Sequence, residues 1–150
     1  MNTNWSSLLD KWSSTFALKR FPPANEKALA IASEHVSGLP AQLEALYHES
    51  NGLVAGPFKI LPIEERTDAR RTWDSLSRAN DVRHSRFLGR SPQLLGRFLV
   101  FSDIGAGRAG AIDRTDGSIW FEEEGTLRQT DLSLDRFIEM NLMEQLDFLP

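Results

Sequence analysis

The sequence contains no cysteine among its 150 residues. Disulfide bonds and thiolate-ligated zinc sites are therefore excluded. Its three histidines, His35, His48 and His84, lie far apart in the sequence, and no two of them have the spacing of metal ligands. We expect neither a metal site nor a bound cofactor.

Long apolar stretches are also missing. No segment approaches the roughly 18–20 consecutive apolar residues of a membrane-spanning helix, and residues 1–14 lack the basic start and apolar core of a signal peptide. We therefore expect a cytoplasmic protein with no membrane partner. A hydrophobic content of 41% in 150 residues is enough for one core, so residues 1–150 are predicted to form a single domain.

Catalytic motifs are scarce too. The sequence has no G-x-S-x-G motif and no cysteine nucleophile. Glu122 and Glu124 share one face of a predicted strand, which is an arrangement that acid–base catalysis uses when one carboxyl is buried. Because they stand beside Glu123 and Gly125 at a turn, we expect both to be exposed. The sequence therefore predicts a protein that is not an enzyme.

Residues Gly105–Gly110 match the G-x-G-x-x-G pattern of dinucleotide sites. That function needs a helix to begin within the motif, so that its amide end binds the pyrophosphate. Here the residues that follow have β character, and Thr115-Asp116-Gly117 is typical of a tight hairpin. We interpret the motif as a connection between two strands.

Charge is distributed unevenly along the chain. The net charge is −4 and the isoelectric point is near 5.4, which argues against nucleic acid as a partner. Residues 66–97, called the arginine segment below, carry eight Arg and three Asp and have a net charge of +5. Residues 98–150 carry four Arg and eleven Asp or Glu and have a net charge of −7. Such segregation produces local fields that steer binding partners.

Two interpretations of each charged part stay open. The arginines either contact phosphates or pair within the fold, Arg70 with Asp74 and others with the acidic half. The acidic residues either keep the sheet soluble or attract a basic protein surface. The acidic residues concerned are Asp103, Asp113, Asp116, Glu122, Glu123 and Glu124.

Apolar spacing predicts helices in the first half of the chain. Asn25 is expected to be the N-cap of the second helix, and Asn51-Gly52 is expected to close the third. Trp73 falls on the apolar stripe of a fourth helix. The predicted helices span residues 5–14, 25–38, 39–52 and 64–80, with a strand over 58–63. Residues 81–96 are predicted to form a loop, or a loop with one short turn.

Period-two patterns predict strands in the second half. They cover residues 97–101, 109–113, 118–122 and 126–129, and by alternation one of Trp120 and Phe121 belongs to the core. A final helix carries Leu134 to Leu142, capped by Asp131 or Ser133. The order of elements predicts an α+β fold with N-terminal helices, an antiparallel sheet meander and a C-terminal helix.

An ordered series of residues resembles the SUKH superfamily, the Smi-and-Knr-like domain. In the first half it comprises Leu39-Pro40, an amphipathic helix ending in Tyr47 and Asn51-Gly52, and a strand that leads into Leu61-Pro62-Ile63-Glu64. In the second half it comprises residues 98–101, 102–107, Ile112-Asp113, Gly117, Ile119, Trp120 and a helix after Asp131-Leu132. The resemblance covers residues 25–142. It departs from the family at residues 108–111, which lack a bulky side chain, and in the arginine-rich stretch 66–90.

The resemblance implies an α+β domain that binds a protein through its sheet surface. Many members are immunity proteins that neutralise a cognate toxin delivered between bacteria, often a nuclease or a deaminase, and the family has no catalytic residues. We therefore expect a toxin as the partner. The expected contacts are the acidic residues Asp103, Asp116, Glu122, Glu123 and Glu124, with Trp120 as an aromatic anchor.

Two other functions stay open at this point. Some members of the superfamily are regulatory or scaffolding domains. The arginine segment, residues 66–97, alternatively makes the protein a nucleic-acid binder.

Overall fold

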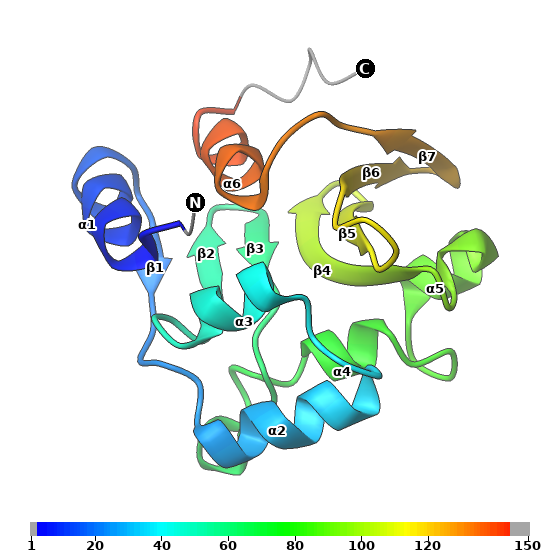
Figure 1. The fold of residues 1–150 in the computed structure, drawn as a ribbon, viewed down its shortest axis with the longest axis horizontal. Coiled ribbons are helices and arrows are strands. Elements are labelled where there is room, and N and C mark those ends of the chain that lie inside the picture. The colour runs from blue at the N-terminus through cyan, green and yellow to red at the C-terminus, as the bar shows by residue number, and fades with distance from the viewer. Residues whose placement is uncertain (1–2, 145–150) are drawn as a thin grey trace.

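The structure is a computed structural model and describes residues 3–144. Within these residues, six α-helices accompany one antiparallel sheet of seven strands in the order β1 to β7, as Figure 1 shows. The predicted α+β fold, with N-terminal helices, a meander and a C-terminal helix, is confirmed. None of the helices in the described part is long and apolar enough to cross a membrane.

The elements follow one another in three groups. The first contains α1 (Trp5–Thr15), β1 (Lys19–Arg20), α2 (Glu26–His35), α3 (Ala41–Tyr47), β2 (Leu53–Ala55) and β3 (Phe58–Ile60). The arginine segment contains the 3-10 turns η1 (Arg66–Asp68) and η2 (Pro92–Leu94) and the short helices α4 (Leu76–Ala79) and α5 (Arg86–Arg90). The last group contains β4 (Phe98–Gly105), β5 (Arg108–Asp113), β6 (Ile119–Glu123), β7 (Thr126–Gln129) and α6 (Leu134–Leu142).

Local chemistry fixes the ends of the first helices. The side chain of Asn25 accepts hydrogen bonds from the backbone N–H groups of Lys27 and Ala28, so it is the N-cap that the sequence predicts. The helix ends at His35, and the chain leaves it through Ser37 and Gly38, whose φ values are +63° and +104°. The start of this helix was therefore predictable from a single residue.

Asn51 joins the end of α3 to the segment after β3. Its side chain accepts a hydrogen bond from Ile63 N (2.7 Å) and donates one to Ile63 O (3.0 Å), and Tyr47 Oη donates to Leu61 O (2.5 Å). The helix itself ends at Tyr47, so the prediction that Asn51-Gly52 closes it is wrong. These residues of the SUKH resemblance instead form one buried hydrogen-bonded unit, in which burial raises the pKa of Tyr47.

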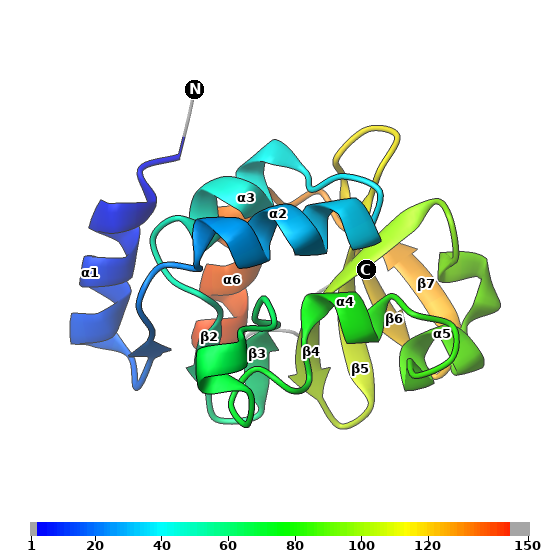
Figure 2. The same ribbon diagram turned by 90° about the horizontal axis from the view of Figure 1, so that it is seen from below.

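The two faces of the meander contact different parts of the chain. Successive residues of a strand point to opposite faces, so Ala109, which pairs with Glu122, faces away from Gly110, which pairs with Phe121. Phe137 of α6 packs on the Gly110 face. The arginine segment covers the face that carries Glu122, and Figure 2 shows α4 and α5 over the β4–β6 part of the sheet.

Close packing explains why position 110, within the stretch 108–111, has no side chain. A Cβ at this position would lie 2.9 Å from Cζ of Phe137 and 3.2 Å from Cβ of Ser102. Phe137 is fully buried and also packs against Phe101, with ring centroids 5.6 Å apart. The small residue thus makes room for the C-terminal helix.

The prediction of a helix over residues 64–80 is wrong. The buried hydroxyl of Thr72 donates to backbone carbonyls, at 2.8 Å to Asp68 O, and accepts from Glu65 N, which stabilises a turn instead. Ser75 then caps the short helix α4. Trp73, placed on the predicted apolar stripe, is 55% exposed.

Three further elements differ from the sequence predictions. Residues 81–96, predicted as a loop with at most one short turn, contain both α5 and η2, and Ser85 caps α5 by accepting from Leu88 N. The strand predicted over 58–63 ends at Ile60. Strands β1 and β2 were not predicted, because two or three residues are too short to show a period-two pattern.

Replacement of Gly110 by alanine tests the contact between α6 and the sheet. We expect Gly110→Ala to lower the free energy of unfolding by about 1–3 kcal/mol, because the added methyl group overpacks the site against Phe137. The matched control is Gly89→Ala in α5, where a Cβ would meet no atom within 4 Å. Urea unfolding of both variants measures the effect, and an equal stability of the two would contradict the packing argument.

Candidate functional site

One side chain of the arginine segment forms hydrogen bonds with the backbone of β4, as a neighbouring strand would. Asn80, directly after α4, donates from Nδ2 to Val100 O (2.8 Å) and accepts at Oδ1 from Val100 N (2.8 Å). Both polar groups of this residue in β4 are therefore satisfied by the segment. The contact places the arginines that follow over strands β4, β5 and β6.

Three arginines of the segment form ion pairs with the acidic strands. Arg86 Nη2 lies 2.8 Å from Asp103 of β4, and Arg97 Nη2 lies 2.7 Å from Asp113 of β5. A third pair joins Arg90 to Glu122 of β6 at 2.5 Å. The interpretation that arginines meet the acidic half of the same fold is confirmed. Part of the charge segregation along the chain thus serves ion pairing within the fold.

Glu122 is the most enclosed of these carboxylates. Its side chain is fully buried, and it accepts hydrogen bonds from Arg90 Nε (2.9 Å), Arg90 Nη2 (2.5 Å), Ser91 Oγ (2.9 Å) and Gly125 N (3.0 Å). The prediction that Glu122 is exposed is wrong, because strand alternation turns it beneath α5. A residue placed in this way is inaccessible to a partner, so Glu122 is removed from the predicted interface.

The local environment keeps the buried carboxylates ionised. Burial alone would raise the pKa of Glu122, but hydrogen bonds from Arg90, Gly125 and Ser91 outweigh it and hold the pKa below its ordinary value. Burial also opposes ionisation of Asp113, whose pKa is nevertheless lowered by hydrogen bonds from Arg97 and Thr115. Carboxylates with lowered pKa values are poor proton donors, so neither has the raised pKa of a general acid.

The predicted contact residues fall into two groups at opposite ends of the meander. Glu122, Glu123 and Glu124 stand at the β6–β7 turn, where Glu122 and, more weakly, Glu124 and Asp103 raise the pKa of Arg90. Asp103 is half-buried and paired, whereas Glu123 and Glu124 are exposed. The sequence did not reveal this division, because it gave no sign of which acids Arg86 and Arg90 would reach.

Asp116 and Trp120 form the second group, at the β5–β6 turn. Asp116 Oδ1 accepts from Ser118 N (2.9 Å) and Ser118 Oγ (2.6 Å), and these bonds lower the pKa of Asp116. Ser118 Oγ accepts in turn from Trp120 Nε1 (2.9 Å). The half-buried Trp120 packs edge-on against Phe98, while Phe121 is buried, as alternation predicted for one of the two.

The remaining arginines of the segment have varied surroundings. Arg71 pairs with Asp68 and donates to Asn51 O (2.9 Å), and Arg83 pairs with Asp81. Arg70 is exposed and forms no ion pair within residues 3–144, so the predicted pair with Asp74 is wrong. Internal pairing leaves few of the eight arginines free to contact phosphates.

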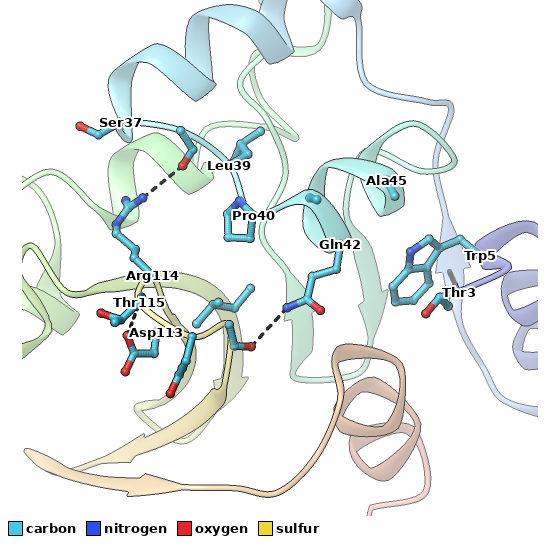
Figure 3. A pocket seen from close by; sticks show the side chains of 15 residues that line it. Thr3, Trp5, Ser37, Leu39, Pro40, Gln42, Ala45, Asp113, Arg114 and Thr115 are labelled. Atoms are coloured by element: carbon cyan, nitrogen blue, oxygen red, sulfur yellow. Dashed lines mark hydrogen bonds between the residues drawn. The ribbon is translucent and has the colours of Figure 1, made fainter. Parts of the chain in front are cut away.

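A hollow of about 1020 Å³ lies between the α2–α3 connection and the β5–β6 turn (Figure 3). Arg114 Nη1 donates to Gly38 O (3.1 Å) and Gln42 Nε2 donates to Gly117 O (3.4 Å), so polar contacts span it. Its two carboxylates, Asp113 and Asp116, both have lowered pKa values, whereas burial lowers the pKa of Arg114. Such a lining can bind polar groups but supplies no carboxyl with a raised pKa.

No metal-binding cluster of three or more His, Cys, Asp or Glu side chains occurs in the described part of the chain. The G-x-G-x-x-G motif forms the turn between β4 and β5, which confirms the prediction of a connection between two strands. No protein-family model matches the chain, and a search of the curated proteins finds no match. The SUKH resemblance therefore stays a prediction from the sequence.

Removal of the Glu122 carboxylate tests its structural role. We expect Glu122→Ala to lower the free energy of unfolding by about 1–3 kcal/mol, because it leaves the half-buried Arg90, the Ser91 hydroxyl and the Gly125 N–H without their acceptor. Glu123→Ala, one residue away and exposed, is the control and is expected to stay within about 0.5 kcal/mol. Urea unfolding measures both. Similar losses in the two variants would contradict the account.

The lowered pKa of Glu122 also predicts a pH dependence. A carboxyl whose pKa is lower in the folded than in the unfolded state stabilises the fold above its ordinary pKa of 4.5 and loses that effect as the pH falls through the folded value. The stability gap between wild type and Glu122→Gln should therefore be largest near neutral pH and shrink in acid. Unfolding at a series of pH values measures this gap, and a gap independent of pH would contradict the prediction.

Proposed function

We propose that this protein is a non-catalytic binding module that acts in the cytoplasm as an immunity protein of the SUKH type. In this function it neutralises a bacterial toxin by binding it directly. Support comes from the ordered series of family-like residues over 25–142, and from an α+β architecture of the kind that the resemblance implies. A regulatory or scaffolding domain of the same superfamily is the alternative.

The observation that carries the proposal is the exposed acidic tip of the β6–β7 hairpin. Glu122 is bound by Arg90, but the next two residues, Glu123 and Glu124, are exposed. Glu124 has a φ of +50° and Gly125 has a φ of +86°, a turn conformation that favours asparagine or glycine at both positions. Glutamate at this strained position is unfavourable for folding, which supports a role for its carboxylate in binding.

Charge complementarity indicates the kind of toxin surface that fits this tip. A toxin that cleaves or modifies nucleic acid needs a basic surface to hold phosphates. Two adjacent exposed carboxylates attract such a surface and increase the rate of association. Asp116 and the half-buried Trp120, at the other end of β6, are the remaining candidate contacts, and Asp103 contributes only if its pair with Arg86 opens.

Toxin neutralisation can be tested with the full chain as bait in an extract of its native cells. We expect a stoichiometric partner that arrests growth when expressed alone in a host cell, and expect co-expression of this protein to restore growth. A stable partner that is not toxic would contradict the immunity function and favour the regulatory or scaffolding alternative.

Charge reversal tests the acidic tip with the same partner. We expect Glu123→Lys combined with Glu124→Lys to lower the association rate by about tenfold or more at low salt, and to flatten its dependence on salt. The control combines Glu26→Lys with Glu34→Lys, an identical charge change at two exposed residues of α2. Stopped-flow or surface-based kinetics measure the rates. Equal effects of the two variants would exclude the tip as the contact.

A further inference from the structure

Arg78 differs from the paired arginines of its segment because it stacks on an exposed aromatic ring. Its guanidinium carbon lies 3.7 Å from the ring centroid of Trp73. Trp73 is 55% exposed, and a large aromatic side chain in that position leaves apolar surface in water. Tryptophan and arginine are also the residues most enriched where binding energy concentrates in protein interfaces. The pair therefore has the composition of a binding site.

The donors of Arg78 are free. Within residues 3–144 its guanidinium has no carboxylate at ion-pair distance and donates no hydrogen bond, whereas those of Arg86 and Arg90 are bound to Asp103 and Glu122. The contact with Trp73 holds the guanidinium in place without using any of its hydrogen-bond donors. A guanidinium prepared in this way binds a carboxylate through two parallel hydrogen bonds.

A small hollow of about 170 Å³ lies beside Arg78. Leu61, Ala79 and Phe87 supply its apolar lining. The charged groups around the hollow have a net positive charge. Arg86 neutralises Asp103, and the remaining groups are two cations, Lys59 and Arg78, and one anion, Asp74. A hollow that combines a few apolar side chains with a net positive charge fits an aliphatic side chain next to an acidic one.

We propose that this surface, formed by Trp73, Arg78 and the adjoining hollow, binds an acidic segment of a protein partner. A carboxylate of the segment pairs with Arg78, and a neighbouring aliphatic side chain enters the hollow. The ring of Trp73 packs against the methylene groups of the bound acidic side chain. The proposal is independent of toxin neutralisation, because the surface has the opposite charge to the Glu123–Glu124 tip and requires a different partner surface.

The test uses the folded full chain and the peptide acetyl-Glu-Leu-Glu-Leu-Glu-amide as the probe, with titration followed by NMR or calorimetry. We expect saturable binding that Arg78→Ala weakens by about tenfold and Trp73→Ala weakens several-fold. Arg70→Ala, which removes the same charge from an exposed unpaired arginine of the segment, is expected to weaken binding by less than about twofold. Arg78→Lys keeps the charge but loses the planar fork, so it should resemble Arg78→Ala.

Three results would overturn the proposal. The first is an absence of saturable binding by the unmodified protein. The second is an equal loss with Arg78→Ala and Arg70→Ala, which would reveal a general effect of charge. The third is tighter binding of a short oligothymidylate than of the peptide with the same dependence on Trp73, which would identify single-stranded nucleic acid as the ligand. Thermal unfolding of each variant confirms that the chain remains folded.

Discussion

The ion pair between the buried Glu122 and the half-buried Arg90 holds the arginine segment against the sheet. A carboxylate beneath a helix is stable only when its oxygens are bound, and here Arg90, Ser91 and the β6–β7 turn bind them together. The pair therefore fixes α5 against the sheet. The Arg86–Asp103 and Arg97–Asp113 pairs and the Asn80–Val100 contact extend the same attachment along β4 and β5.

The ion pairs between the arginine segment and the sheet determine which charged side chains remain available to contact a partner protein. The opposite charges of residues 66–97 and 98–150 neutralise each other where the two parts of the chain meet. Among the charges with no ion-pair partner within residues 3–144 are the carboxylates of Glu123 and Glu124 on a hairpin and the guanidinium of Arg78 on Trp73. The acidic tip suits a basic partner surface, whereas the Trp73–Arg78 surface suits an acidic segment. The two proposed binding functions are therefore independent.

Much of the fold follows from local signals in the sequence, but the site follows from contacts that no local signal encodes. Asn25 marks a helix start, and the strands of the second half show clear alternation, so these elements were predictable. The helical spacing of Trp73 was misleading, because the chain forms turns over residues 69–74 and α4 begins only at Leu76. Glu122 resembled its exposed neighbours, and only its pairing with an arginine 32 residues earlier in the chain distinguishes it.

A double-mutant cycle between Arg90 and Glu122 tests the central claim most directly. The free energies of unfolding of Arg90→Ala, Glu122→Ala and the double variant are compared with that of the unmodified protein. We expect a coupling energy above about 1 kcal/mol, with a double variant much more stable than the sum of the single losses implies. Losses that add to within about 0.5 kcal/mol would contradict it, because the pair would then not hold the arginine segment on the sheet.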